Sequence, residues 1–100
     1  TMKVFVYTKR RRENRFKPEP TNPFAHIDSV NIEGKFHANL IGLVLDQSAQ
    51  GCGLVFQSQN GFEIGEICRI KIGSYEPVQA EVRWKQKLDD SLIKVGFRFL

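Results

Sequence analysis

The sequence predicts an all-β domain, either a sandwich or a closed barrel. Three observations lead to this class: apolar and polar residues alternate with a period of two, helical periodicity is nearly absent, and turn-forming residues recur at short intervals. A barrel is favoured over a sandwich because open sheets would leave long exposed edges in a chain of 100 residues. This length fits one domain with a single core.

Three segments in the second half of the chain alternate most clearly. In each of them, apolar residues expected to face the core are separated by mostly polar residues expected to face outward. The inward sets are Cys68, Ile70 and Ile72; Val78, Ala80, Val82 and Trp84; and Ile93, Val95, Phe97 and Phe99. Since Trp84 falls in the second set, the pattern predicts that its ring packs in the core and does not stack on a base.

The strands expected in the first half are less regular. Residues 36–45 include apolar residues at both odd and even positions. The alternation changes phase around Gly42, which predicts a β-bulge or a sharp bend there. Residues 25–30 and 54–56 are two further expected strands. Turn chemistry separates the segments at Glu33-Gly34, Asn60-Gly61, Gly73-Ser74 and Asp89-Asp90-Ser91.

Positive charge is concentrated at the N-terminus. Residues 1–17 carry seven Lys and Arg against one acid, a net charge of +6, and the rest of the chain carries eight against ten, a net charge of −2, which together give the +4 of the whole chain. Such a concentrated field favours an anionic partner. We therefore expect a flexible basic N-terminal arm over residues 1–17 and a barrel over residues 18–100.

Other chemical functions find little support in the composition. Cys52 and Cys68 stand at no metal-ligand spacing and are expected to be reduced core residues, while His26 and His37 belong to no nucleophile or metal pattern. We expect no catalytic residue, no metal and no cofactor. No apolar run approaches the roughly 20 residues of a membrane-spanning helix, and no secretory signal is apparent. The protein is expected to be soluble and cytoplasmic, without membrane insertion.

The first motif lies in the basic arm, where Arg11 and Arg15 have the spacing Arg-x-x-x-Arg. Guanidinium groups bind phosphates bidentately, reach the O6 and N7 edge of guanine, and stack on base faces. This spacing alone is weak evidence, because it is expected by chance in about one of two such chains, and a basic run is most often a solvated tail.

The second motif, Asp46-x-Ser48-x-x-Gly51, directly follows an apolar strand. Such a turn would place short polar side chains at a barrel rim. Asp can accept hydrogen bonds from N1 and N2 of guanine, Ser can donate to a phosphate, and Gly lets a ligand approach the main chain. All three residues are also ordinary turn formers that satisfy their own backbone.

The two motifs, in this order and some 30 residues apart, resemble the signature of the PilZ domain family. Residues 80–84 and 95–99 resemble the last two barrel strands of that family, so the likeness covers roughly residues 10–100. Gln50 departs from the glycine of many members. The resemblance implies a six-stranded antiparallel barrel that binds cyclic di-GMP. It also implies a bacterial receptor that changes conformation on binding and controls motility, secretion or exopolysaccharide production through an unidentified protein partner.

The same resemblance assigns ligand contacts to individual residues. Arg11 and Arg15 would grip phosphates and guanine edges, and the turn with Asp46, Ser48 and Gly51 would complete the base pocket. Arg10 stands just before the first motif arginine, at a position that influences whether one ligand or a stacked pair is bound. These six residues form the expected cyclic di-GMP site.

Two alternatives remain open on the sequence. One is a small nucleic-acid-binding barrel, in which the arm follows phosphates and aromatic rings stack on bases. It is disfavoured because Trp84, Phe97 and Phe99 are expected in the core. The other is a PilZ-like adaptor that binds no ligand, against which the intact arginine motif argues.

Overall fold

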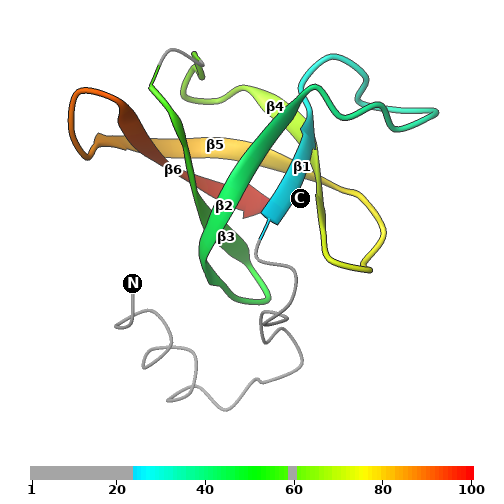
Figure 1. The fold of residues 1–100 in the computed structure, drawn as a ribbon. Helices are drawn as coiled ribbons and strands as arrows, with labels where there is room; N and C mark the ends of the chain where they lie inside the picture. The colour runs from blue at the N-terminus through cyan, green and yellow to red at the C-terminus, as the bar shows by residue number, and fades with distance from the viewer. Residues whose placement is uncertain (1–23, 59–60) are drawn as a thin grey trace.

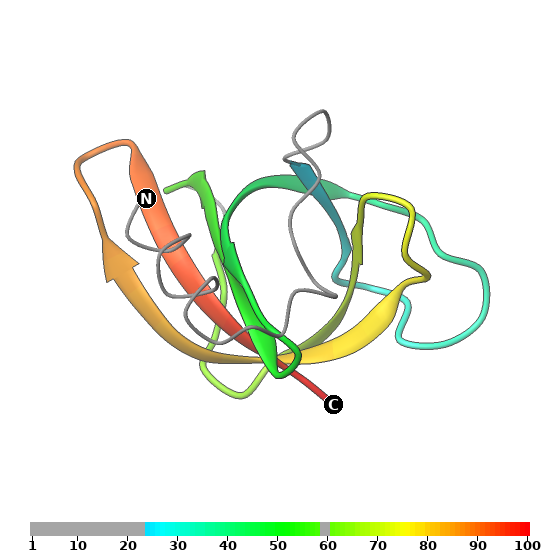
Figure 2. The same cartoon turned by 90° about the horizontal axis from the view of Figure 1, so that it is seen from below.

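The computed structural model describes residues 24–58 and 61–100, and over these residues the chain is all-β. Its six strands form a closed antiparallel barrel with the neighbour order β1-β2-β3-β6-β5-β4 (Figure 1). Seen from below, the strands curve into a ring around the core (Figure 2). The bounds are β1 Phe24–Asp28, β2 Leu40–Gln47, β3 Gly51–Gln57, β4 Ile67–Ile72, β5 Val78–Lys87 and β6 Leu92–Phe99.

This architecture confirms the predicted barrel, and closure pairs every strand on both sides. The residues described include no helix long and apolar enough to cross a membrane. The basic arm lies outside the described residues, so its proposed boundary at residue 17 stays a prediction.

The core is formed by the side chains at the alternating strand positions that face inward. Cys68, Ile70 and Ile72 are buried as the alternation predicts, and so are Val95 and Phe97. Three rings, Phe56, Phe62 and Phe97, pack together with centroids 4.7–6.3 Å apart, in tilted and edge-to-face arrangements. Phe62 comes from the β3–β4 connection and is 2% exposed, so this connection contributes a ring to the core.

The two cysteines are buried and unpaired, as predicted. Burial raises the pKa of both thiols, that of Cys68 to about 12. They therefore act as small neutral core residues. Within residues 24–58 and 61–100, no three His, Cys, Asp or Glu side chains come together as a metal-binding group.

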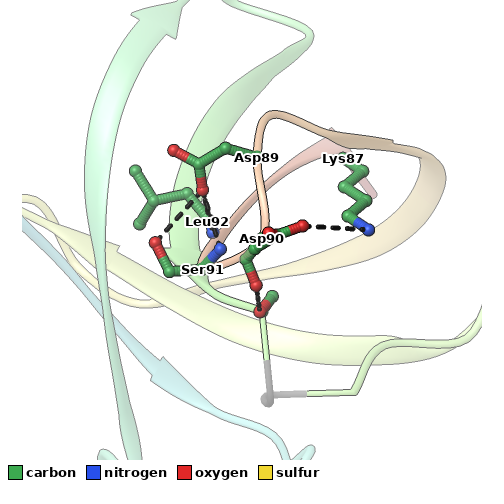
Figure 3. Close-up of polar contacts among 6 residues, drawn as sticks. Lys87, Asp89, Asp90, Ser91 and Leu92 are labelled. Carbon is green, nitrogen blue, oxygen red and sulfur yellow. Dashed lines mark hydrogen bonds and ion pairs between the residues drawn. The ribbon is translucent and has the colours of Figure 1, made fainter.

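The β5–β6 turn shows how the predicted turn residues work (Figure 3). Oδ1 of Asp89 accepts hydrogen bonds from the backbone N–H of Ser91 at 2.7 Å, the Ser91 hydroxyl at 3.1 Å and the backbone N–H of Leu92 at 2.9 Å. These bonds, above all that from the Ser91 N–H, hold the pKa of Asp89 below its ordinary value. Lys87 and Asp90 form an exposed ion pair at 3.7 Å. The turn thus fixes the hairpin register without a glycine.

Asp28 organises the long β1–β2 connection. Its side chain is on the outer parity of β1 but is fully buried, because residues 30–37 fold over it. The carboxylate accepts backbone N–H bonds from Asn31 at 2.8 Å, His37 at 2.8 Å and Val30 at 3.0 Å. Burial raises the pKa of Asp28, but these hydrogen bonds outweigh it and set the pKa well below its usual range.

Candidate functional site

The Asp-x-Ser-x-x-Gly motif spans the end of β2, the turn at residues 48–50 and the first residue of β3. The Ser48 amide donates to the Gly51 carbonyl oxygen at 2.9 Å, and the Ser48 hydroxyl accepts from the Gln50 N–H at 3.2 Å. A Cβ at Gly51 would collide with the carbonyl oxygen of Phe97, so glycine lets β6 approach β3 closely. Ser48 and Gly51 therefore have structural roles. Asp46 is the motif residue that directs a charged side chain to the outer face.

A β-bulge in β2 determines the direction of Asp46. Val44 pairs with Leu54 and Asp46 with Gly53, so Leu45 is an extra residue in β2. Without it, Asp46 would share the parity that faces the core. The bulge lies between Val44 and Asp46, so the prediction of an irregularity around Gly42 was right about the strand and wrong about the position. Gly42 itself faces inward, where the ring of Phe56 packs against it.

A second bulge reverses the parity of β5. Val82 pairs with Phe97 and Trp84 with Gly96, so Arg83 is the extra residue. Ala80 and Val82 are fully buried, whereas Trp84 is 43% exposed on the outer face. The prediction that Trp84 packs in the core was therefore wrong. The alternation that predicts β5 holds up to Val82 and fails beyond it, because an inserted residue exchanges the two faces of a strand.

The two bulged strands flank a glycine floor, Gly53 on β3 and Gly96 on β6, which pair directly with each other. Together with their neighbours they form one row across four strands, in the order Asp46, Gly53, Gly96, Trp84. A Cβ at Gly53 would lie 2.8 Å from Oδ1 of Asp46, and a Cβ at Gly96 would collide with the Trp84 indole. Because Gly53 and Gly96 have no side chains, the Asp46 carboxylate and the Trp84 indole can both lie against the outer face of the sheet, one at each end of the row.

Lys94 lies between these two groups. Its Nζ is 3.6 Å from Oδ2 of Asp46 and 5.6 Å from the centroid of the Trp84 ring, and its side chain is only 20% exposed. Its stem crosses the floor, since a Cβ at Gly53 would lie 3.1 Å from its Cε. An acceptor, a cation and an aromatic face therefore converge on the same outer surface.

An open pocket of about 670 Å³ lies on this surface, and its lining includes Asp46, Trp84, Lys94, Gly96, Ser48, Gly51 and the cations Arg83 and Arg98. This volume is within the range of pockets that hold small ligands. Three cations against the single carboxylate of Asp46 give the pocket lining a net positive charge. The arrangement suits an anionic ligand that carries a flat ring with hydrogen-bond donors on its edge.

The structure brings three of the six predicted site residues together: Asp46, Ser48 and Gly51. Arg10, Arg11 and Arg15 lie outside the described residues, and their contacts stay a prediction. Trp84 was missed because period-two alternation cannot locate an inserted residue, and Lys94 was missed because only the pairing of β6 with β3 brings it next to Asp46. A sequence signal did exist in Gly96, since a glycine inside an otherwise apolar strand marks a close approach by a neighbouring group.

A family model described as PilZ domain matches residues 9–100. This chain belongs to the PilZ domain family. No curated protein and no solved structure gave a significant match. The PilZ domain family is a family of cyclic di-GMP receptors whose domains typically serve binding and adaptor roles. In this PilZ domain the matched range includes both the arginine pair at positions 11 and 15 and the Asp-x-Ser-x-x-Gly motif at residues 46–51.

Proposed function

We propose that this PilZ domain is a receptor for cyclic di-GMP, which binds on the outer face of β2, β3, β6 and β5. The observation that carries the proposal is the cross-strand row in which Asp46 and Trp84 face each other over Gly53 and Gly96. A guanine base is flat, has donors at N1 and N2, and is linked in this ligand to two phosphates. The pocket offers a partner for each of these features.

Each group has a defined role in this proposal. The Asp46 carboxylate accepts hydrogen bonds from N1 and N2 of guanine, and the exposed face of the Trp84 indole stacks on the base. The Ser48 hydroxyl donates its proton to a phosphate while its oxygen keeps the bond from Gln50. Arg11 and Arg15 supply bidentate contacts to phosphates and guanine edges, and Arg10 stacks on a second ligand.

Binding would be coupled to the basic arm. The arm carries a net charge of +6 and the remainder of the chain −2. On binding, charge-assisted contacts would order the arm across the pocket and present a changed surface to a protein partner. The domain would then act, without catalysis or a cofactor, as a cytoplasmic adaptor in a bacterial pathway that controls motility, secretion or exopolysaccharide production.

The exposure of Trp84 removes one argument against a nucleic-acid-binding barrel, yet the distribution of rings disfavours it. Phe24 on β1 and Tyr75 in the β4–β5 connection are the other exposed aromatic residues in the part of the chain described. Phe24 lies next to Ala25, which pairs with Ile72 at one end of β4, whereas Trp84 lies beyond Glu81, which pairs with Ile67 at the other end. A single isolated ring serves one base, whereas single-stranded nucleic acids use a series of stacking rings.

Calorimetric titration tests the proposal. Cyclic di-GMP, GTP and a short single-stranded oligonucleotide would be titrated into the full chain and into Arg11→Ala, Arg15→Ala and Asp46→Ala. We expect preferential binding of cyclic di-GMP, weakened at least about tenfold by each substitution, because each removes a charge-assisted hydrogen bond. Equal affinity in all four proteins would refute the proposed site. Length-dependent, salt-sensitive oligonucleotide binding without preference for the cyclic dinucleotide would favour the nucleic-acid barrel.

A further inference from the structure

We infer that Lys94 determines base specificity in this pocket by donating a hydrogen bond to O6 of guanine, beside the contacts that Asp46 makes to N1 and N2. The inference rests on the proposed function, since it concerns the base of the same ligand. It starts from the position of the Lys94 ammonium group, 3.6 Å from Oδ2 of Asp46 on the pocket side of the glycine floor.

The order of donors and acceptors on guanine matches this pair. Along its Watson–Crick edge, guanine presents the O6 acceptor next to the N1–H donor and then the N2 amino donor. A base whose N1 and N2 donors meet the Asp46 carboxylate brings O6 to one side of that carboxylate. A cation within 4 Å of the carboxylate oxygen can therefore complete the three-point contact.

Adenine has the opposite donor and acceptor pattern at two of these three positions. Its N6 amino group is a donor at the place of O6, and its N1 is an acceptor at the place of N1–H. In this pocket the amino group would face the Lys94 cation, and N1 would face the Asp46 carboxylate. Sites that leave buried polar groups unpaired or opposed discriminate strongly between related ligands. The pair Asp46 and Lys94 thus selects guanine and rejects adenine.

Packing keeps the Lys94 ammonium group in this place. The side chain is 20% exposed, its stem lies over Gly53, and its ammonium group also lies 5.6 Å from the Trp84 ring. The stacking face and the donor are therefore held next to each other. The arginines of the arm do not replace this contact. The O6 oxygen has two lone pairs: an arginine that binds O6 and N7 uses the one on the N7 side, and Lys94 would use the one on the N1 side.

The test compares cyclic di-GMP with cyclic di-AMP and with the inosine analogue, which keeps O6 and N1–H but lacks the N2 amino group. Affinities are measured by calorimetry for the full chain and for Lys94→Met, which retains the stem that packs on the floor. The control is Lys87→Met, which removes an exposed lysine paired with Asp90 in the β5–β6 hairpin. Thermal melting of each variant confirms that it is folded, and Lys94→Gln provides a second variant.

We expect Lys94→Met to weaken binding of cyclic di-GMP and of the inosine analogue about tenfold or more, the loss expected for a charge-assisted hydrogen bond. Binding of cyclic di-AMP should not weaken, so the preference for guanine over adenine shrinks by the same factor, while Lys87→Met leaves it unchanged. An equal loss for all three ligands would overturn the inference, because it would mean that Lys94 only attracts phosphates. Tighter cyclic di-GMP binding by Lys94→Met would also overturn it, because Lys94 would then only block Asp46.

These outcomes separate the inference from the proposed function. If the unsubstituted chain binds cyclic di-GMP and loses affinity on Asp46→Ala, but Lys94→Met keeps the guanine preference, only the role of Lys94 is wrong. If the unsubstituted chain binds no cyclic di-GMP, the proposed function and this inference fail together.

Discussion

The regular strand pair β3–β6 and the bulged strands β2 and β5 contribute differently to the core and to the pocket of this barrel. β3 and β6 pair without a register shift over seven residues and place Leu54, Phe56, Val95 and Phe97 in the core. β2 and β5 each contain one extra residue, and after it each directs a chemically useful side chain outward, Asp46 and Trp84. The comparison indicates that the regular pair supplies core residues and the glycine floor, and that the bulges turn Asp46 and Trp84 outward over that floor.

The largest expected effect is a loss of stability on removal of a core side chain from the regular pair β3–β6. Phe56 on β3 is 2% exposed and packs against Phe62 at a centroid distance of 4.7 Å. Phe56→Ala should lower the free energy of unfolding by about 3–5 kcal/mol, because it leaves a cavity among the three rings. Urea denaturation followed by far-ultraviolet circular dichroism measures the loss. Leu43→Ala, at a 40% exposed position of β2, is the control and should change stability much less.

The next effect tests whether the floor must be glycine. Gly96→Val should abolish most ligand binding, with a loss of about a hundredfold or more, because the new side chain would displace the Trp84 indole. Gly61→Ala is the matched control, since nothing lies within 4 Å of a Cβ there. Calorimetry with cyclic di-GMP, alongside thermal melting of both variants, separates loss of binding from loss of folding. Unchanged affinity in folded Gly96→Val would mean that the indole is not held by this floor.

A smaller effect tests whether Trp84, on the bulged strand β5, serves binding more than stability. Trp84→Ala should weaken cyclic di-GMP binding about tenfold to a hundredfold, since base stacking on an aromatic ring is worth about 1–3 kcal/mol. The free energy of unfolding should change by less than the Phe56→Ala variant loses, because Trp84 is 43% exposed. Phe24→Ala removes an exposed ring at the opposite end of β4 from Trp84 and should leave binding unchanged. Similar affinity losses in both variants would argue against a site centred on Trp84.

The smallest effect concerns acid stability and lies outside both regions. Asp28 has a pKa below its unfolded value of about 4, because three backbone N–H groups bond its carboxylate. Its stabilising contribution is therefore present at neutral pH and is lost as the pH falls below about 4 toward the folded-state pKa. Denaturation at pH 7 and pH 3 should show a smaller decrease in stability for Asp28→Asn than for the unsubstituted chain. An equal decrease would place the acid sensitivity elsewhere, with Asp89 as the next candidate.

Period-two alternation predicted three strands where no residue is inserted, whereas β1 and β3 were expected at 25–30 and 54–56 and extend over 24–28 and 51–57. β4, β6 and the first half of β5 lie on the predicted faces, because the pleat alone sets their side-chain directions. Leu45 and Arg83, the inserted residues, have no glycine or proline beside them to reveal a bulge. Their positions are set by how the strands twist and pair with β3 and β6, which involves residues far apart in the chain.

The candidate site was predicted in part for the same reason. The turn with Asp46, Ser48 and Gly51 was identified because its residues are contiguous, so a local motif is enough. Trp84 and Lys94 join it only through the register of β5 and β6, which a single sequence does not specify. The contacts of the basic arm remain predictions, since its residues are outside those that the structure describes.

The central claim is that cyclic di-GMP binds over the row from Asp46 to Trp84, and the emission of Trp84 tests it most directly. Trp84 is the only tryptophan in the chain, so its fluorescence reports this pocket alone. Titration of the full chain with cyclic di-GMP should give a saturable change in Trp84 emission that shifts to at least about tenfold higher ligand concentration in Asp46→Ala. Calorimetric binding of cyclic di-GMP with no change in Trp84 emission would contradict the account.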